Sequence, residues 1–429
     1  MQHPHVQNEL PIEVLSSILR LSTSDLTTSL RSYKCGGNAE WEPYNNVLQD
    51  CTQFRLVDST WNAVATPILY SIFVLPAWPL EKLIRRAKAV DYHPELITAL
   101  VISGCVDYDT TEVEAEEHQI FNIICSCLRR CTSISLLDVH LGGYTPLLES
   151  DAEEFFANIQ SDSLTSLAIL YPSVDAIANA ILGLGTRSSQ LKELVLYNVH
   201  SDPTHLIPTG PLHFPSVSSL TMHWEWPPGF GGTPFAQLFA TLILGERSGS
   251  STPLQALTIS GILDLDAPHI STLLSSYNNI GISLTSLQLN LPPSLTTSTV
   301  FEALPNTILS LCPALIRFLY FAWCPTSLLY ALPSRLQEFG VTIVHIAIPG
   351  PKVASLLTTI TPLIELVKEP RYRKGIQKLQ IQWALSQPPG AQRRLEDACI
   401  EEGVEFSSIE TSVSNEPKPV LHLTRSSGL

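Results

Sequence analysis

A short hydrophobic pattern recurs ten times along this chain of 429 residues. It reads apolar–x–x–apolar–x–apolar, and its last two apolar positions lie two residues apart. Two residues is the side-chain period of a β-strand, so we expect both positions to face the same core. The ten copies span residues 97–102, 134–139, 164–169, 191–196, 217–222, 254–259, 284–289, 315–320, 336–341 and 376–381.

Stretches with apolar residues at helical spacing separate most of these strands. Helices are expected over residues 119–130, 175–182, 235–244, 269–277, 300–311, 353–366 and 392–402. Gly183, Gly245 and Gly403 follow three of them, where a helix C-cap favours glycine. The regular alternation predicts an α/β fold with parallel strands and with helices on their outer side.

Two architectures fit this alternation: a doubly wound nucleotide-binding sheet, or an open solenoid. Ten similar strands favour the solenoid, and the glycine-rich phosphate turn of the doubly wound fold is absent after the first strand. Residues 97 to about 410 resemble an irregular leucine-rich-repeat array. The strand spacing varies from 21 residues (315 to 336) to 40 residues (336 to 376), a wider range than the roughly 20–29 residues of typical repeats, and their asparagine ladder is missing.

The first seventy residues do not follow the repeat. Leu10 and Pro11 begin a helical stretch in which Ile12, Leu15 and Ile18 fall on one face.

A second helical stretch covers residues 51–66 and contains Val57 and Trp61. A polar insert, residues 22–46, separates the two stretches. Together they resemble the two conserved blocks of an F-box, ahead of repeats like those of fungal F-box proteins.

An F-box is a small helical module whose apolar anchors are covered by the adaptor Skp1, which connects it to a cullin. The resemblance implies a substrate receptor of a ubiquitin ligase. It assigns Skp1 contacts to Leu10, Pro11, Ile12, Leu15, Ile18, Val57 and Trp61. The alternative is a plain repeat scaffold whose first seventy residues only seal the open end of the array.

Three regions follow from these patterns. Residues 1–74 form the expected F-box-like helical module, residues 75–410 the irregular repeat domain, and residues 411–429 a C-terminal tail.

Residues that alternate with the core positions of each strand are expected to line a surface for a protein substrate. Arginine and large aromatic residues such as tyrosine often contribute most of the binding energy at protein interfaces. The candidate substrate-binding residues are Glu193, Tyr197, His223, Arg317, Phe321, Lys378 and Gln380. Trp383 shares the parity of the core positions and is expected to be packed.

The charge balance narrows the choice of partner. The chain has 25 basic and 40 acidic residues, a net charge of −15. Nucleic acids and anionic membrane surfaces are therefore disfavoured as partners. The apolar stretch over residues 318–332 contains Pro325 and reads as two buried repeat elements rather than a membrane span.

The first nine residues lack the apolar segment of a secretory signal, and the nine cysteines read as reduced thiols. A cytoplasmic or nuclear location is expected.

Catalytic and metal-binding motifs are not evident. Cys125, Cys127 and Cys131 lack the paired spacing of a zinc site and are expected to be buried thiols. The acidic run 107–117 lacks the glycine of a calcium loop and reads as a solvated loop. Gly229–Gly232 lacks the lysine of a phosphate loop. We therefore expect no cofactor, no metal and no enzymatic activity, with an enzyme built on an α/β sheet as the remaining alternative.

Overall fold

The computed structural model contains two compact units. The first comprises Met1–Val217 with Thr241–Thr252, and the second comprises Ser218–Ala240 with Pro253–Leu429. The structure describes residues 17, 59–77, 79–103, 112–140, 152–170, 177, 180, 182–197, 216–223, 253–260, 270–271, 274, 280–290, 300–323, 325–344, 359–369, 375–384 and 390–410.

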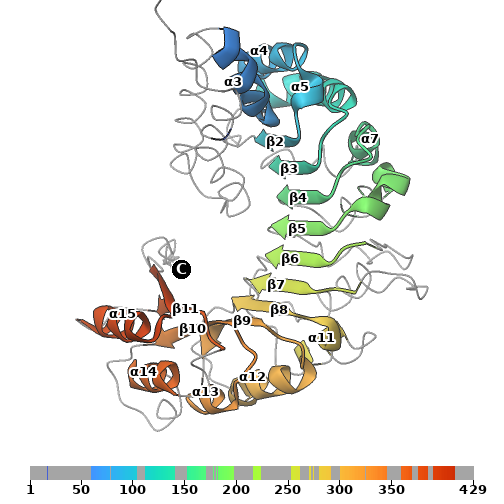
Figure 1. Ribbon diagram of the computed structural model, residues 1–429. Coiled ribbons are helices and arrows are strands. Elements are labelled where there is room, and N and C mark those ends of the chain that lie inside the picture. The colour runs from blue at the N-terminus through green and yellow to red at the C-terminus, as the bar shows by residue number, and fades with distance from the viewer. Residues whose placement is uncertain are drawn as a thin grey trace, which may run out of the picture. The chain divides into compact units, whose positions relative to one another are not determined.

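The first unit is built on five parallel strands that pair in the order of the chain (Figure 1). Its strands are β1 (Ile72–Pro76), β2 (Ala99–Ser103), β3 (Leu136–His140), β4 (Ser166–Leu170) and β5 (Glu193–Tyr197). Each strand pairs with the next at equivalent positions, so that Leu100, Leu137, Leu167 and Leu194 form one buried row. This row is the core that the hydrophobic pattern predicted.

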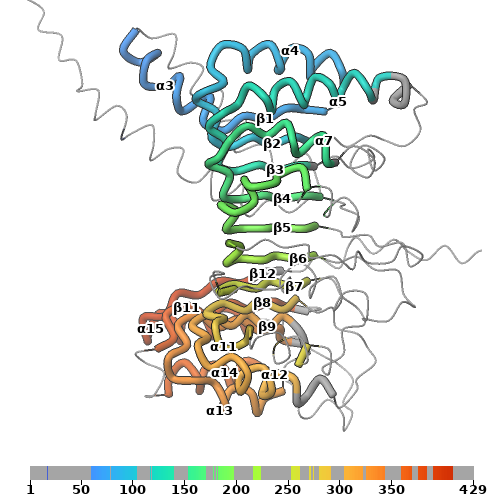
Figure 2. Tube along the Cα trace, turned by 90° about the vertical axis from the view of Figure 1, so that its right-hand side faces the viewer, coloured from blue at the N-terminus to red at the C-terminus, as the bar shows by residue number. Residues whose placement is uncertain are grey.

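Helices of the first unit lie on one side of these strands (Figure 2). They are α3 (Ser59–Ser71), α4 (Leu80–Val90), α5 (Glu112–Arg130) and α7 (Ala152–Ala157), with 3₁₀ helices at Pro94–Leu96 and Gly185–Gln190. Leu83, Leu128 and Phe156 are fully buried, so α4, α5 and α7 each contribute an apolar face to the core.

The second unit repeats the arrangement with seven parallel strands, again in chain order. They are β6 (Ser219–His223), β7 (Ala256–Ser260), β8 (Ser286–Asn290), β9 (Arg317–Trp323), β10 (Glu338–Val344), β11 (Lys378–Ala384) and β12 (Glu405–Glu410). Its helices are α11 (Ile280–Ser283), α12 (Val300–Leu311), α13 (Ser327–Ala331), α14 (Thr361–Lys368) and α15 (Ala391–Glu402).

All ten strands predicted from the hydrophobic pattern are present. The expected helices over 119–130, 300–311 and 392–402 are confirmed as α5, α12 and α15. Gly403 caps α15 with a left-handed φ of 71°, as expected. Within each unit the strand order follows the chain. A doubly wound sheet reverses its strand order near the centre, so the doubly wound alternative is wrong.

Several expectations need correction. Residues 112–117, which were read as part of a solvated loop, form the first turns of α5, and residues 107–111 lie outside the described residues. Gly183 is helical rather than a cap, and a side chain there would collide with the backbone of α7. Strands β1 and β12 were not predicted.

Candidate protein-binding surface

Most of the expected Skp1 anchors are not among the described residues. They are Leu10, Pro11, Ile12, Leu15, Ile18 and Val57. The insert 22–46 and the tail 411–429 also lie outside the described residues. Trp61 is described and lies in α3, where it packs half-buried against Val64 and Ala65, together with Ile68. These four residues occur at i, i+3, i+4 and i+7, which places them on one face of the helix.

Helix α3 runs directly into the sheet of the first unit. Its last residues precede β1, and the Thr98 hydroxyl before β2 donates to the Ser71 carbonyl over 3.0 Å. The Tyr70 ring meets His93 edge-on, with ring centroids 4.9 Å apart. The helix that carries Trp61 is therefore packed onto the start of the strand array.

The candidate substrate residues lie on the front face of the strands, which we define by the side chains that alternate with the core positions. Glu193 and Tyr197 lie on β5 of the first unit. The Ser166 hydroxyl donates to a Glu193 carboxylate oxygen over 2.8 Å, and Tyr197 is half-buried. His223 lies on β6 of the second unit, where its Nδ1 is 2.7 Å from the Ser260 hydroxyl.

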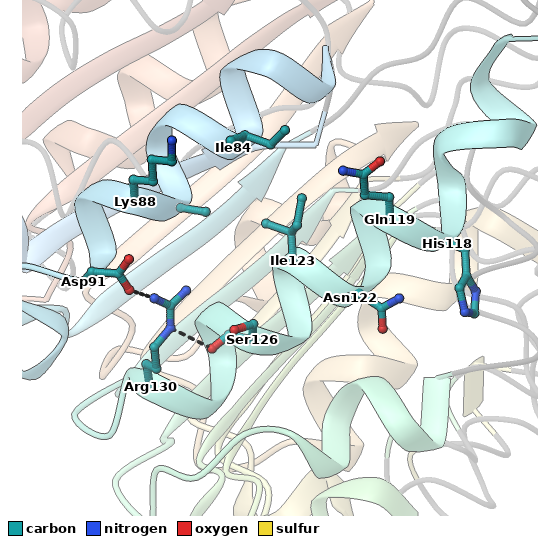
Figure 3. Close-up of a pocket in the computed structure, with 10 residues that line it drawn as sticks. Ile84, Lys88, Asp91, His118, Gln119, Asn122, Ile123, Ser126 and Arg130 are labelled. Atoms are coloured by element: carbon teal, nitrogen blue, oxygen red, sulfur yellow. Dashed lines mark hydrogen bonds and ion pairs between the residues drawn. The ribbon is translucent and has the colours of Figure 1, made fainter.

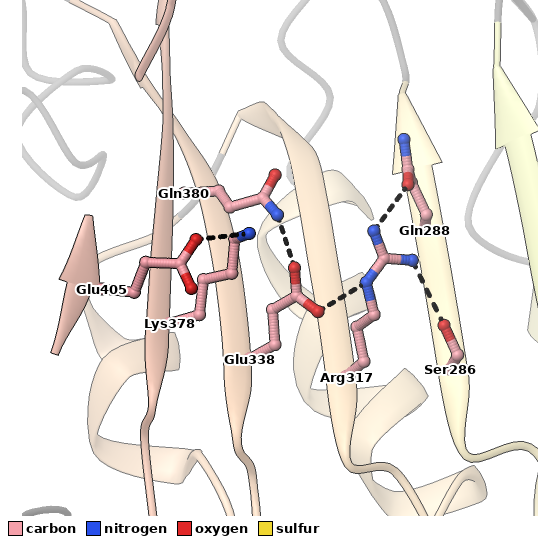
Figure 4. A network of polar contacts seen from close by, with 7 residues as sticks. All are labelled: Ser286, Gln288, Arg317, Glu338, Lys378, Gln380 and Glu405. Carbon is pink, nitrogen blue, oxygen red and sulfur yellow. Dashed lines mark hydrogen bonds and ion pairs between the residues drawn. The ribbon is translucent and has the colours of Figure 1, made fainter. Parts of the chain in front are cut away.

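The remaining candidates lie on β9 and β11, and three of them belong to one polar network (Figure 4). The Arg317 Nε donates to Glu338 over 2.8 Å. The other nitrogens of the same guanidinium lie 3.4 Å from the Ser286 hydroxyl and 3.4 Å from the Gln288 Oε1. One arginine thus connects three strands, which its rigid fork of donors allows.

The network continues beyond Glu338 toward the last strand. The Gln380 amide donates to the second oxygen of Glu338. The Lys378 ammonium lies 2.7 Å from a Glu405 carboxylate oxygen on β12. We call Arg317, Glu338, Lys378 and Glu405 the charge ladder, because the strand register places them side by side with alternating sign. Their charges cancel, so this part of the front face is polar and neutral.

Phe321 differs from the other candidates. Its ring is only 5% exposed, so it offers little surface to a partner. The cause lies on the next strand, where Gly340 has no side chain. A Cβ built at Gly340 would lie 2.6 Å from Leu319 Cδ2 and 3.1 Å from the Phe321 ring. The glycine leaves room that Leu319 and Phe321 fill.

Glu338, Glu405 and Ser286 belong to the network but were not among the residues predicted to line this face. The available signal was positional: Arg317, Glu338, Lys378 and Glu405 each occupy the residue just before a core position of their strand. Opposite charges at this position in successive strands predict cross-strand pairs, provided that the strand order is known.

A groove of about 610 Å³ lies on the helical side of the first unit, between α4 and α5 (Figure 3). Ile84 and Ile123 supply apolar lining, and Asn122 supplies polar lining. At one end Arg130 forms an ion pair with Asp91 and donates through Nε to the Ser126 carbonyl over 3.0 Å. That bridge joins the C-terminal ends of the two helices.

Cys125, Cys127 and Cys131 are buried thiols that form no disulfide, and their burial was predicted. Burial, together with the two neighbouring cysteines, raises the pKa of Cys127 to about 12. Burial also raises the pKa of Cys131 to about 12, although Arg130 acts in the opposite direction. Such thiols stay protonated near neutral pH, as is typical of inert structural cysteines. Within the described ranges, no group of His, Cys, Asp or Glu is arranged to hold a metal ion.

The described helices include none long and apolar enough to cross a membrane. The apolar stretch 318–332 was expected to contain two repeat elements, and it is divided between β9 and α13. No protein-family model matches the sequence, and no curated protein matches it either.

Proposed function

We propose that this chain is the substrate-recognition adaptor of a Skp1–cullin–F-box ubiquitin ligase, built on irregular leucine-rich repeats. The observation that carries the proposal is the order of features along the chain. Two F-box-like blocks, one starting at Leu10–Pro11 and one ending at Trp61, precede a long series of parallel strand–helix units. Ubiquitin transfer would be performed by other subunits, and this chain would not catalyse a reaction.

In this proposal the amino-terminal helices dock on Skp1 by placing apolar side chains in a groove of the adaptor. Leu10, Pro11, Ile12, Leu15 and Ile18 supply the first group of anchors, and Val57 with Trp61 supplies the second. Skp1 connects the assembly to the cullin.

The repeat units would hold the protein substrate on their front face. Arg317, Lys378 and Gln380 support this role because they lie together in a half-buried, charge-neutral network. Glu193, Tyr197 and His223 extend the candidate surface along the front faces of their own units. Phe321 would support the surface from beneath rather than touch the substrate.

Co-purification with Skp1 tests the ligase role. The wild-type chain is expected to retain Skp1, and Leu10→Ala/Pro11→Ala is expected to lose it while the thermal unfolding profile is unchanged. Leu182→Ala/Pro313→Ala is a matched control, because it removes the same residue types at exposed positions of the two units. Failure of the wild-type chain to retain Skp1 would remove the ligase role.

A second candidate is a scaffold without a ubiquitin role, in which the first seventy residues cap the strand array. The packing of α3 against the start of the sheet favours it. Trp61→Ala separates the two candidates. A cap predicts that the substitution destabilises the first unit, whereas an F-box predicts weaker Skp1 retention as well.

A further inference from the structure

The last strand of the second unit, β12 (Glu405–Glu410), ends the strand order, and it pairs with β11 along one side. Within the described ranges, no strand pairs with its other side. The exposed edge of a sheet presents a row of backbone N–H and C=O groups, which is a template for another strand.

The direction of these backbone groups follows from one hydrogen bond. The Glu405 N–H donates to the Gln377 carbonyl over 2.8 Å, so it points toward β11. Backbone groups alternate in direction along a strand, which turns the N–H of Phe406 and Ser408 toward the outer edge and that of Ser407 toward β11. The outer edge therefore has donors at alternate residues.

The charge ladder ends at this edge. Its signs alternate from Arg317 to Glu338, Lys378 and Glu405. Glu405 uses one carboxylate oxygen for Lys378, and its side chain remains 65% exposed. The next position outward in the same register would lie beside a carboxylate. Opposite charges at directly neighbouring positions stabilise strand pairing, and like charges oppose it.

We propose that the outer edge of β12 binds an extended segment of a partner protein by strand addition, with a lysine or arginine of that segment beside Glu405. The added residue would continue the ladder with its next positive charge. The net charge of −15 adds a general preference for a basic segment. The inference rests on the proposed use of the repeats to capture a protein, but it does not depend on Skp1 binding.

Substitutions in β12 separate backbone pairing from charge. Ser408→Pro removes an outward N–H and leaves the β11 pairing in place, as proline on a sheet edge permits. Ser407→Pro is its matched control, because it removes an inward N–H and is expected to lower the unfolding temperature. Glu405→Gln removes the charge alone, and Glu405→Lys reverses it.

The test uses the full chain and arrays of eight-residue peptides of strand-forming residues, with lysine, alanine or glutamate fixed at the centre. Lysine-centred peptides are expected to be enriched, and fluorescence anisotropy then measures the affinity of the best of them. Ser408→Pro and Glu405→Lys should each weaken it roughly tenfold. Glu405→Gln should weaken it about threefold. Methylating alternate backbone nitrogens of the peptide should abolish binding without any change to the protein.

Several results would overturn the proposal: no enrichment of any peptide, equal enrichment of glutamate-centred peptides, or unchanged affinity in Ser408→Pro. Binding that appears only after deletion of residues 411–429 would assign the edge to this chain's own last segment. Self-association that Ser408→Pro abolishes would assign it to a second copy. A chain that binds these peptides but not Skp1 would retain the β12 site and lose the ligase role, so the two failures are distinguishable.

Discussion

The front face of β2 and the front face of β8 lie on strands with the same core alternation, yet they differ in chemistry. On β2, Ala99 and Val101 are buried on the front as well as Leu100 and Ile102 on the core side. On β8, Ser286 and Gln288 are half-buried and bonded to Arg317. One fold thus supports an apolar front at β2 and a polar front at β8.

The difference can be read in the strand sequences. Ala99–Ser103 is apolar at four consecutive residues, which is typical of a strand buried on both faces. Ser286–Asn290 alternates polar and apolar residues, which is typical of a strand with one solvated face. A front face that is free to bind a partner is therefore expected in the second unit and not at β2.

Val101→Glu is expected to have the largest effect on the free energy of unfolding. Val101 is 1% exposed, so the substitution would bury a carboxylate without a designed partner and lower the free energy of unfolding by about 3 kcal/mol or more. Gln288→Glu, at the equivalent position of β8, is the control and should change it by less than about 0.5 kcal/mol. Urea unfolding followed by circular dichroism measures both, and equal losses would show that the two fronts do not differ.

Glu338→Gln tests whether the polar front stabilises the second unit. The substitution weakens the bonds from Arg317 and Gln380 to a half-buried carboxylate, so a loss of about 1–2 kcal/mol is expected. Glu401→Gln makes the same change at the exposed Lys368–Glu401 pair and should cost less than about 0.5 kcal/mol. If both variants unfold at the same urea concentration, the network contributes no more than a surface ion pair.

The buried thiols make the stability of the protein depend on pH. The pKa of Cys127 and of Cys312 is raised to about 12 by burial, from an ordinary value of 9.0. Unfolded thiols lose their protons above pH 9 while folded ones keep them, so unfolding releases protons. The free energy of unfolding should therefore fall as pH rises from 9 toward 12.

The same thiols report on each unit separately. Cys127 belongs to the first unit and Cys312 to the second. Pulsed alkylation at pH 8 with mass spectrometry should leave both unlabelled in the folded chain. In the Val101→Glu variant, Cys127 should become labelled at a lower urea concentration than Cys312. Simultaneous labelling would mean that the units unfold together.

The sequence predicted the strands well because their apolar triplets combine a short period with strong burial. It missed β1 because Ile72–Pro76 follows α3 with no turn residue between them. It missed β12 because Glu405–Glu410 has no apolar triplet, and its pairing with β11 depends on backbone bonds. The charge ladder could not be read from sequence alone, because its members become neighbours only through strand register. Arg317 and Glu338 are 21 residues apart in the chain, and Glu338 and Lys378 are 40 residues apart.

Pairing of each strand with its neighbour in the chain has a consequence for how the protein forms. Within either unit the loops that must close are about the length of one strand–helix segment, so the entropic cost of each closure stays modest even in a chain of 429 residues. Contacts of low sequence separation favour fast folding. Strands β1 to β5 could therefore assemble on the ribosome before β12 has been synthesised.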